Sequence, residues 1–467
     1  MSEVRGPARL DELYDVVVVG GGTAGWAAAL AAAREGASVL LLERKGYVGG
    51  VLSSGLPING FFDASQRQVI KGSADELVER LREVGGSSGY RLTDLWFAGQ
   101  VFVDPALIKA VLLEMLQEAG VRLLLFSQVV DVARDGERIE HLVVQGRSGA
   151  FLCRGRTFVD SSGDAVLSFL SGSPLQSLDR LQPPTLVFRI ENVDLPRLRE
   201  HLADHPEDFM SGRMLPGRTL TREFLRNTDF FFAFPGLTRQ VEARGEYVPL
   251  IDRFMFTATP GGTGVVVNML RARDADGTSS ESLSRATVDL YTNLVPLVRF
   301  FRERIPGFER CTLCDAEPEV QLRETRRIVG DYTLTDEDVT AGRDFADSVA
   351  VGGYFIDIHS STDSHGRWQL LERPYGIPYR TLLPQGLEGV LTAGRCISGT
   401  ETAAASYRVM ATCMAMGQAA GTAAALSSGT GKPPRELDPE KLRARLAEER
   451  AVVSVAEVER TGRAGDA

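Results

Sequence analysis

The stretch of sequence that decides the fold is DVVVVGGGTAGWAAALAAAREGASVLLLE, residues 15–43. The apolar, β-branched run Asp15–Gly20 predicts a buried strand, and Ser38–Leu42 predicts a second one. Between them, the alanine-rich segment Gly25–Glu35 predicts a helix. A strand, a helix and a strand within about 30 residues form a βαβ unit with a right-handed crossover, so the sequence predicts an α/β fold.

The glycines between the first strand and the helix fit the pattern G-x-G-x-x-G. Gly20 permits a tight turn, Gly22 lets the backbone approach a pyrophosphate, and Gly25 lets the helix pack closely on the strand. The helix N-terminus supplies N–H groups and a partial positive charge for the diphosphate. Glu43 can accept hydrogen bonds from ribose hydroxyls, whereas the adjacent Arg44 would suit a 2′-phosphate. These residues predict a Rossmann-like, dinucleotide-binding domain.

Further glycines favour FAD over NAD as the dinucleotide. Gly49, Gly50 and Gly55 form a run that can bring backbone close to the diphosphate and the isoalloxazine ring, although a flexible loop is the alternative. The segment GVLTAGR, residues 389–395, predicts a strand and a glycine turn before a helix, with amides beside the ribityl chain. No second G-x-G-x-x-G follows an apolar strand, so a separate nicotinamide domain is not expected.

Composition narrows the class of protein. A length of 467 residues favours two or three domains, and a net charge of −10 argues against a nucleic-acid partner. The N-terminal residues lack the apolar core of a signal peptide, and no apolar run approaches the ~20 residues of a membrane span. The pair Cys311 and Cys314 lacks the further ligands of a metal site. We therefore expect a cytoplasmic protein that takes a small-molecule substrate without metal or membrane; a homodimer is one assembly open to it.

The rest of the chain predicts an inserted second domain. Three strand-like segments that predict an antiparallel β-meander within the first domain are Val121–Ala133, Ile139–Gln145 and Phe151–Val159. A long helix of small residues is predicted over Tyr407–Leu426. The expected division is a first part of the FAD-binding domain (1–171), an α+β substrate domain (172–376), a returning FAD-binding segment (377–430) and a charged helical tail (431–467).

Blocks of sequence spread over nearly the whole chain carry a family resemblance. They are Tyr14–Gly25, Leu42–Gly50, Val159–Asp164, Arg323–Asp338, Ile356–His359 and Ile377–Gly421. In them the chain resembles the FAD-dependent oxidoreductase family, flavoproteins distantly related to fumarate reductase flavoproteins. The resemblance implies an FAD fold with an inserted substrate domain but no single substrate. The residues expected to contact the cofactor are Gly20, Gly22, Thr23, Ala24, Gly25, Glu43, Arg44, Gly49, Gly50, Val129, Asp160, Gly163, Asp164, Gly394 and Arg395.

Candidate acid–base residues follow from residue type and position. His359 is the first, because histidine titrates near neutral pH and can accept a substrate proton; a core histidine bonded to backbone is the alternative. Glu401 and Tyr407 come just after the glycine turn, with a solvated carboxylate and a core aromatic as their alternatives. Many members of the family carry a histidine near Glu401, so this chain departs from them and no histidine's role passes to that residue.

An arginine cluster is the second catalytic candidate. Arg326 lies in an extended segment in which alternation would put Arg323 and Arg327 on one face. A guanidinium there could hold a substrate carboxylate or stabilise a reduced flavin anion. Ion pairing with Glu324 or Glu319 is the equally open alternative.

The sequence predicts an FAD-dependent dehydrogenase or oxidase that transfers hydride from a small organic molecule to flavin. The alternatives are a fumarate reductase-like alkene reductase, a flavin monooxygenase or halogenase, and a flavin-binding subunit without chemistry of its own. The opening GGGTAGW is similar to tryptophan halogenases, but Trp26, Trp96 and Trp368 do not form their Trp-x-Trp-x-Ile-Pro element.

Overall fold

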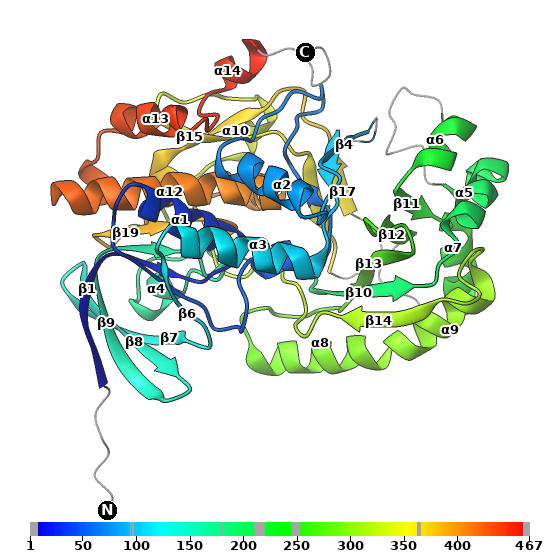
Figure 1. The fold of residues 1–467 in the computed structure, drawn as a ribbon, viewed down its shortest axis with the longest axis horizontal. Coiled ribbons are helices and arrows are strands. Elements are labelled where there is room, and N and C mark those ends of the chain that lie inside the picture. Colours follow the sequence, from blue (N-terminus) through cyan, green and yellow to red (C-terminus); the bar gives the residue numbers. More distant parts are fainter. Residues whose placement is uncertain are drawn as a thin grey trace, which may run out of the picture.

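Two sheets organise the chain in the computed structural model, which describes residues 8–93, 95, 98–178, 181–209, 220–244, 253–361 and 366–460 (Figure 1). The larger sheet has the order β6-β2-β1-β9-β8-β7, with β19 paired to β9. Its strands are β1 (Ala8–Val19), β2 (Val39–Leu42), β6 (Arg122–Leu124), β7 (Gln128–Asp135), β8 (Arg138–Gly146), β9 (Gly149–Asp160) and β19 (Val390–Thr392). The first four strands in that order and β19 are parallel to their neighbours, while β7 and β8 form an antiparallel hairpin against β9. The predicted α/β fold class is confirmed.

The βαβ unit forms where the sequence predicts it. Strand β1 pairs in parallel with β2, with Val16 opposite Val39 and Val19 opposite Leu42. Helix α1 (Thr23–Arg34) connects the two strands and is buried along nearly its whole length. The strands carry branched apolar side chains on both faces because helices cover one face of the sheet and the meander covers the other.

A five-stranded antiparallel sheet forms the second layer, on the opposite side of the molecule in Figure 1. Its order is β11-β12-β13-β10-β14, from β10 (Thr185–Glu191), β11 (Phe230–Ala233), β12 (Phe254–Ala258), β13 (Gly264–Arg271) and β14 (Thr312–Ala316). Its apolar core contains residues between Leu186 and Cys311, whereas the core around α1 includes Leu334 to Tyr375. The expected domain boundary at 376 and 377 does not coincide with this division between cores.

Shorter strands and the helices complete the architecture. The small sheets are β3 (Ile58–Asn59), β5 (Gly99–Val101) and β4 (Tyr90–Leu92); β15 (Ser348–Gly352) with β18 (Tyr375–Pro378); and β16 (Ile356–His359) with β17 (Gly366–Gln369). The remaining helices are α2 (Ser73–Glu83), α3 (Pro105–Glu118), α4 (Val166–Leu170), α5 (Leu195–Asp204), α6 (Arg222–Asn227), α7 (Pro235–Ala243), α8 (Ser280–Thr292), α9 (Leu294–Arg304), α10 (Asp336–Thr340), α11 (Glu401–Tyr407), α12 (Met410–Thr430), α13 (Pro439–Glu448) and α14 (Val455–Arg460).

Helix α12 packs on α1 at backbone distance. A Cβ atom at Gly417 would lie 2.1 Å from the Ala24 carbonyl oxygen, and one at Gly421 would lie 2.1 Å from that of Ala28. These glycines are one helical turn apart and therefore face the same neighbour. Both helices run in the same direction along this contact, since the lower-numbered residues of each meet. Their N-termini consequently point toward the same side of the sheet.

Two predicted elements differ from the structure. The segment expected as one strand over Val121–Ala133 is divided into β6 and β7, because Phe126 takes a left-handed φ of 55° and turns the chain. The helix expected over Tyr407–Leu426 begins only at Met410, after the separate helix α11. The two helices meet at an angle of 93°. The small-residue pattern predicts the helix but carries no signal for this bend.

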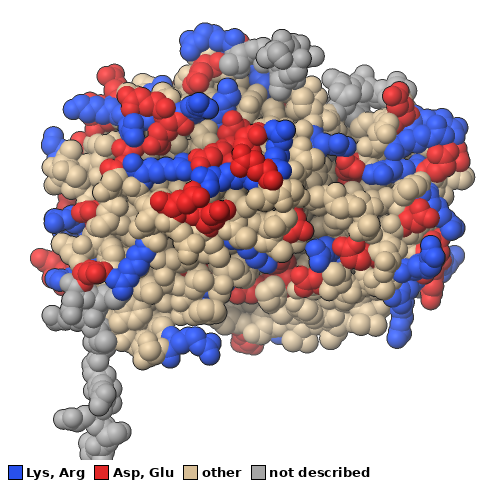
Figure 2. Space-filling model, viewed as in Figure 1, with Lys and Arg blue, Asp and Glu red and all other residues tan. Residues whose placement is uncertain are grey.

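The charged side chains on the surface and the lengths of the helices are relevant to nucleic-acid and membrane partners. Figure 2 shows acidic and basic side chains interspersed on the face in view rather than gathered into one basic patch. Within the described residues, no single helix is long and apolar enough to cross a membrane. Helices α11 and α12 meet that criterion only when they are taken together, across their bend.

The contact between α1 and α12 predicts that two alanine substitutions in α12 change the free energy of unfolding in opposite directions. Gly421→Ala is expected to lower the free energy of unfolding by about 1–3 kcal/mol, because its Cβ meets backbone that cannot give way. Gly429→Ala is the control, because that exposed helical position has no atom near its Cβ and gains helix propensity of up to about 1 kcal/mol. Denaturant titration measures both values. Equal effects of the two substitutions would contradict the packing.

Candidate active site

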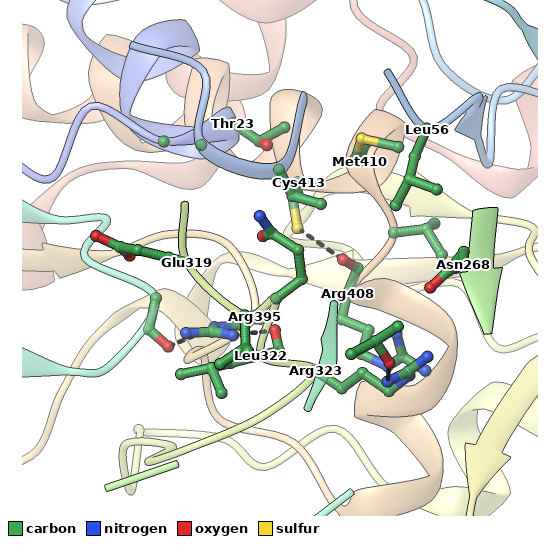
Figure 3. A pocket seen from close by; sticks show the side chains of 18 of the residues that line it. Thr23, Leu56, Asn268, Glu319, Leu322, Arg323, Arg395, Arg408, Met410 and Cys413 are labelled. Atoms are coloured by element: carbon green, nitrogen blue, oxygen red, sulfur yellow. Dashed lines mark hydrogen bonds between the residues drawn. The ribbon is translucent and has the colours of Figure 1, made fainter. Parts of the chain in front are cut away.

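A cavity of about 840 Å³ lies between the two large sheets and joins the glycine turn to the small β16–β17 sheet. Thr23 and Ala24 line one end of it, and Asp357 and His359 line the other. Figure 3 shows Thr23 at one side of this space, Arg395 near its middle, and Arg323 and Arg408 together at the far side. Distant parts of the sequence thus contribute to a single site.

The glycine turn has the geometry that a diphosphate requires. Gly20 has φ of +95°, and a Cβ there would lie 2.7 Å from the Ser162 Cα. A Cβ at Gly25 would lie 1.8 Å from the carbonyl oxygen of Gly20, so this position in the first turn of α1 has no room for a side chain. Around Gly22, by contrast, no atom lies within 4 Å of the Cβ position. The space beside Gly22 and the free N–H groups of the first turn of α1 fit an anionic group.

The second glycine run packs against the first. The Gly49 N–H donates a hydrogen bond of 2.7 Å to the Gly21 carbonyl, and a Cβ at Gly50 would lie 3.2 Å from the Gly22 Cα. This loop is therefore ordered against the dinucleotide turn rather than free, and Gly50 lines the cavity while Gly49 supports it.

Glu43 holds both loops together from the end of β2. Its Oε2 accepts a hydrogen bond of 2.7 Å from the Gly21 N–H, and its Oε1 accepts one of 2.7 Å from the Lys45 N–H. A carboxylate has further lone pairs, so Glu43 retains acceptor capacity toward a ribose hydroxyl in the cavity that it lines. Arg44 also lines the cavity but is paired with Glu319, at 3.0 Å between its Nη1 and Oε1.

Arg395 ties the returning strand to the loop after β9. Its Nη2 lies 2.6 Å from Asp164 Oδ1, its Nε donates to the Gly163 carbonyl at 2.7 Å, and its Nη1 donates to the Leu322 carbonyl. Gly394 precedes it with φ of +91°. Gly163, Asp164, Gly394 and Arg395 all line the cavity, as a cofactor-contacting group would.

Two expected cofactor residues have supporting positions instead. Asp160 is buried, and its carboxylate accepts hydrogen bonds from the Ser162 hydroxyl at 2.6 Å and the Leu167 N–H at 2.8 Å. Burial raises the pKa of Asp160. Val129 packs in the core beneath the β-meander. Neither residue lines the cavity, so the structure gives each a supporting position, and their contact with the cofactor stays a prediction.

The N-terminus of α12 forms another wall of the cavity. Val409, Met410 and Cys413 line it, and the Cys413 thiol donates to the Arg408 carbonyl at 3.3 Å (Figure 3). The first N–H groups of α12 have no intrahelical partner, as in any α-helix, and no side chain caps them at Val409. Two helix N-termini, those of α1 and α12, therefore supply partial positive charge to one cavity.

His359 and Asp357 form a hydrogen-bonded pair at the end of the cavity away from the glycines. Their Nε2 and Oδ2 atoms are 3.0 Å apart. Asp357 also accepts from the Trp368 indole at 2.8 Å and from Arg408 Nη2 at 3.3 Å. The backbone N–H of His359 donates to Gln182 Oε1 at 3.0 Å, while its Nδ1 is buried without a hydrogen-bond partner among the described residues.

Electrostatics fix the charge states of this pair. Burial alone would raise the pKa of the Asp357 carboxyl, but His359 and Arg408 outweigh it and hold that pKa well below its usual range. Burial and the guanidinium of Arg271 lower the pKa of His359 well below its usual range, against the opposing effect of Asp357. The pair therefore consists of an ionised carboxylate and a neutral imidazole near neutral pH.

The arginine segment separates into different environments. Arg323 lines the cavity, whereas Arg327 forms a buried ion pair of 2.8 Å with Glu324, so the expectation that both share a functional face is wrong. Arg326 stacks on Phe169, 4.0 Å from its ring centre, and does not line the cavity. The chain between Arg323 and Arg327 turns repeatedly instead of running as a strand, which defeats the alternation on which the prediction depended.

Two other catalytic candidates also lie outside the cavity. Glu401 is exposed at the start of α11, where partial burial and the carboxylate of Glu324 raise its pKa. Tyr407 is fully buried and donates to the Ile397 carbonyl at 3.2 Å. Both follow the glycine turn in sequence, but the short helix α11 carries them away from it. Neither residue lines the cavity, and their positions agree with a solvated carboxylate at Glu401 and a core aromatic side chain at Tyr407.

Sequence reasoning missed several side chains that line the cavity. Asp357 carried a usable signal, because alternation along a strand puts positions 357 and 359 on the same face. Arg408 carried none, since it lies at a bend inside a segment with continuous helical character. Tyr354 also faces the cavity, and its hydroxyl has no hydrogen-bond partner among the described residues. Such residues converge only through tertiary structure.

Comparison with known proteins defines the class. The model of the family described as FAD dependent oxidoreductase matches residues 15–446, and this chain belongs to that family. FAD is accordingly its cofactor, and the chain is an oxidoreductase enzyme in this broad sense.

Individual relatives match less completely. A urocanate reductase from Eggerthella lenta is 46% identical over 85 residues, which cover 17% of this chain and 13% of that protein. A geranylgeranyl bacteriochlorophyll reductase-like protein from Thermoplasma acidophilum is 13% identical with a TM-score of 0.46, over 94% of this chain and 84% of that one. A p-nitrophenol 4-monooxygenase from Pseudomonas putida DLL-E4 is 12% identical with a TM-score of 0.48, over 94% and 85%. These structural likenesses are too weak to carry an argument about the reaction.

The open space beside Gly22 predicts a variant that separates folding from cofactor binding. Gly22→Ala places its Cβ where no protein atom lies within 4 Å, so the apoprotein is expected to unfold at an unchanged temperature. The same methyl group occupies room that a diphosphate would use, and FAD affinity should fall at least about tenfold, or ~1.4 kcal/mol. Fluorescence titration of apoprotein with FAD measures the affinity. Unchanged affinity would place the diphosphate elsewhere.

Proposed function

We propose that this FAD-dependent oxidoreductase dehydrogenates or oxidises a small organic molecule at the end of the cavity where His359 lies. The observation that carries the proposal is the hydrogen-bonded pair of His359 and Asp357 in the same cavity as the glycine turn. The absence of a second dinucleotide motif in the sequence supports direct exchange of electrons between substrate and flavin.

The tautomer of His359 follows from its partner. An ionised carboxylate can only accept hydrogen bonds, so the 3.0 Å contact with Asp357 requires the proton on Nε2. The lone pair then lies on Nδ1, the atom that lacks a partner among the described residues. Asp357 in this arrangement orients the ring and stabilises the imidazolium that proton uptake creates. Because Nδ1 is buried, His359 can accept a proton from a substrate hydroxyl or amino group only after its ring or a neighbouring side chain shifts and opens Nδ1 to the cavity.

The division of labour in the reaction is simple. FAD, when bound, supplies the acceptor for the hydride that leaves the substrate carbon. His359 holds the proton released from the neighbouring heteroatom, so the substrate loses two electrons and two protons in total. The guanidinium groups around His359 oppose a lasting positive charge on its ring, so the proton must pass on before the next turnover. The aromatic side chains of Tyr354 and Trp368 line the same cavity.

A second candidate is the reduction of an activated alkene. The local match to a urocanate reductase supports it, although that match covers 17% of the chain. Two anaerobic stopped-flow experiments separate the candidates. Bleaching of oxidised enzyme by alcohols, amines or hydroxy acids without NAD(P)H supports dehydrogenation. Reoxidation of chemically reduced enzyme by urocanate supports alkene reduction, and failure of both leaves a flavin-binding subunit.

Removal of the proton acceptor provides a mutational test. His359→Gln is expected to slow flavin reduction by substrate about 10²–10⁴-fold while FAD content stays at the wild-type level. His201→Gln is the matched control, because His201 also pairs with a carboxylate, that of Asp208 at 2.9 Å, but does not line the cavity. An unchanged rate of flavin reduction in the His359 variant would remove that residue from the mechanism.

The charge state of His359 predicts the pH profile. Because its pKa is lowered, the imidazole is already neutral at about pH 6, where an ordinary histidine with a pKa near 6.5 would be largely protonated. The rate constant of flavin reduction should therefore stay level through the range around pH 6.5 in which an ordinary histidine titrates, and decline only at lower pH. A decline centred near pH 6.5 in wild-type enzyme would mean that the imidazole is not held neutral.

A further inference from the structure

The cavity contains a guanidinium group without a counterion. Arg323 Nη1 donates to the Pro183 carbonyl at 2.6 Å and to the Thr185 hydroxyl, and both acceptors are neutral. Its Nε and Nη2 atoms have no hydrogen-bond partner, and no carboxylate lies within ion-pair distance of Arg323, among the residues that the structure describes. The unbonded nitrogens are not among the fully buried polar atoms, so they remain accessible from the cavity that Arg323 lines.

Arg408 adds a second guanidinium beside the first. Its Nη2 donates to the Asp357 carbonyl at 2.7 Å, to Asp357 Oδ2 at 3.3 Å and to Gln182 Oε1 at 3.4 Å. Its Nε is buried without a partner, and its Nη1 makes no hydrogen bond among the described residues. Figure 3 shows the side chains of Arg323 and Arg408 reaching the same corner of the cavity.

Among the residues that the structure describes, positive charge exceeds negative charge around Arg323 and Arg408. Asp357 is the one carboxylate that contacts the arginine pair in the described structure, and it is shared with His359 and Trp368. Uncompensated charge in a desolvated site is unfavourable, and a ligand of opposite charge relieves it. Burial, Arg271 and Arg408 all lower the pKa of Arg323, which expresses the same excess of positive charge.

We propose that Arg323 and Arg408 form the anion-binding end of the cavity and that the substrate carries a carboxylate held there. The planar fork of an arginine matches a carboxylate with two parallel hydrogen bonds. The same cavity is also lined by the apolar side chains of Phe232 and Met255, which are paired on β11 and β12, and by the polar Asn268 of the neighbouring strand β13; this lining suits a carboxylate on an organic body better than a heavily hydrated phosphate. This inference rests on the proposed function in that the same cavity end binds the substrate.

The corner of the cavity that contains Arg323 and Arg408 is separate from the site beside Gly22 that is assigned to the diphosphate. The diphosphate is assigned to the N-terminus of α1 beside Gly22, and Thr23 lies on the opposite side of the cavity in Figure 3. The carboxylate held by Arg323 would lie near His359, because Asp357 contacts both His359 and Arg408, and the Arg408 side chain reaches the same corner as Arg323 in Figure 3. The proton acceptor and the anion anchor thus address neighbouring atoms of one substrate, as in an acid that bears a hydroxyl or amino group.

Matched pairs of probes test the charge requirement in the FAD-loaded enzyme. Acetate and benzoate are titrated against acetamide and benzamide, which have nearly the same shape without the charge, and the flavin absorption spectrum reports binding. At least one carboxylate is expected to perturb the spectrum saturably, at least about tenfold more tightly than its amide. Equal affinity of acid and amide, no perturbation by any probe, or tighter binding of inorganic phosphate than of the carboxylates would overturn the proposal.

Variants then assign the binding to the residue. Arg323→Gln should weaken carboxylate binding by roughly 30-fold or more and leave amide binding unchanged, and Arg323→Lys should restore part of the loss. Arg326→Gln, which alters an arginine outside the cavity, is the control and should bind like the wild type. If Arg323→Gln bound the carboxylates as tightly as the wild type, the assignment would be wrong.

The outcomes also separate this inference from the proposed function. Carboxylate binding that depends on Arg323, with no flavin reduction by any substrate, would retain the anion site and refute dehydrogenation. If uncharged substrates reduced the flavin in a reaction that depends on His359, and carboxylates were not preferred, dehydrogenation would be retained and the anion site refuted. Because the comparison of acid with amide uses the wild-type enzyme, it stands even if an arginine variant fails to fold.

Discussion

The contact on which the rest of the structure depends is the backbone-close packing of α12 against α1. Gly417 and Gly421 have no side chain to separate the helices, and each lies against a carbonyl oxygen of α1. Parallel helices at this distance present their N-termini to one side of the sheet. The cavity opens at that side, so the same contact sets the distance between the glycine turn and the segment that carries Arg408. A wider separation would disconnect the cofactor end from the substrate end.

Asp357 has a corresponding role within the site. The Asp357 carboxylate accepts hydrogen bonds from His359, Arg408 and Trp368. It therefore sets the tautomer of His359 and holds the side chains of Arg408 and Trp368 in place. Its low pKa is a consequence of those neighbours rather than of exposure. The neutral imidazole and the surplus of guanidinium charge then act in different ways on a substrate. In the proposed reaction the imidazole receives a proton, while the guanidinium groups hold an anionic group.

Local patterns predicted the parts of the fold that local physics determines. The βαβ unit, the meander and the glycine turn all depend on periodicity and backbone freedom over a few residues, and they form near their expected positions. The predicted catalytic residues agreed less well with the structure. His359 lines the cavity, but Glu401, Arg326 and Tyr407 do not, because the bend between α11 and α12 and the turns around Arg326 are set by tertiary packing. Alternation along β16 could have found Asp357, whereas no sequence pattern pointed to Arg408.

We propose that one cavity holds FAD at the glycine turn and an anionic substrate at Arg323 and Arg408. The most direct measurement is a crystal structure of the FAD-loaded protein with a bound carboxylate. We expect the diphosphate beside Gly22 and the carboxylate within hydrogen-bond distance of Arg323, with His359 Nδ1 turned toward the ligand. A carboxylate bound away from both arginines, or a diphosphate away from the N-terminus of α1, would contradict it.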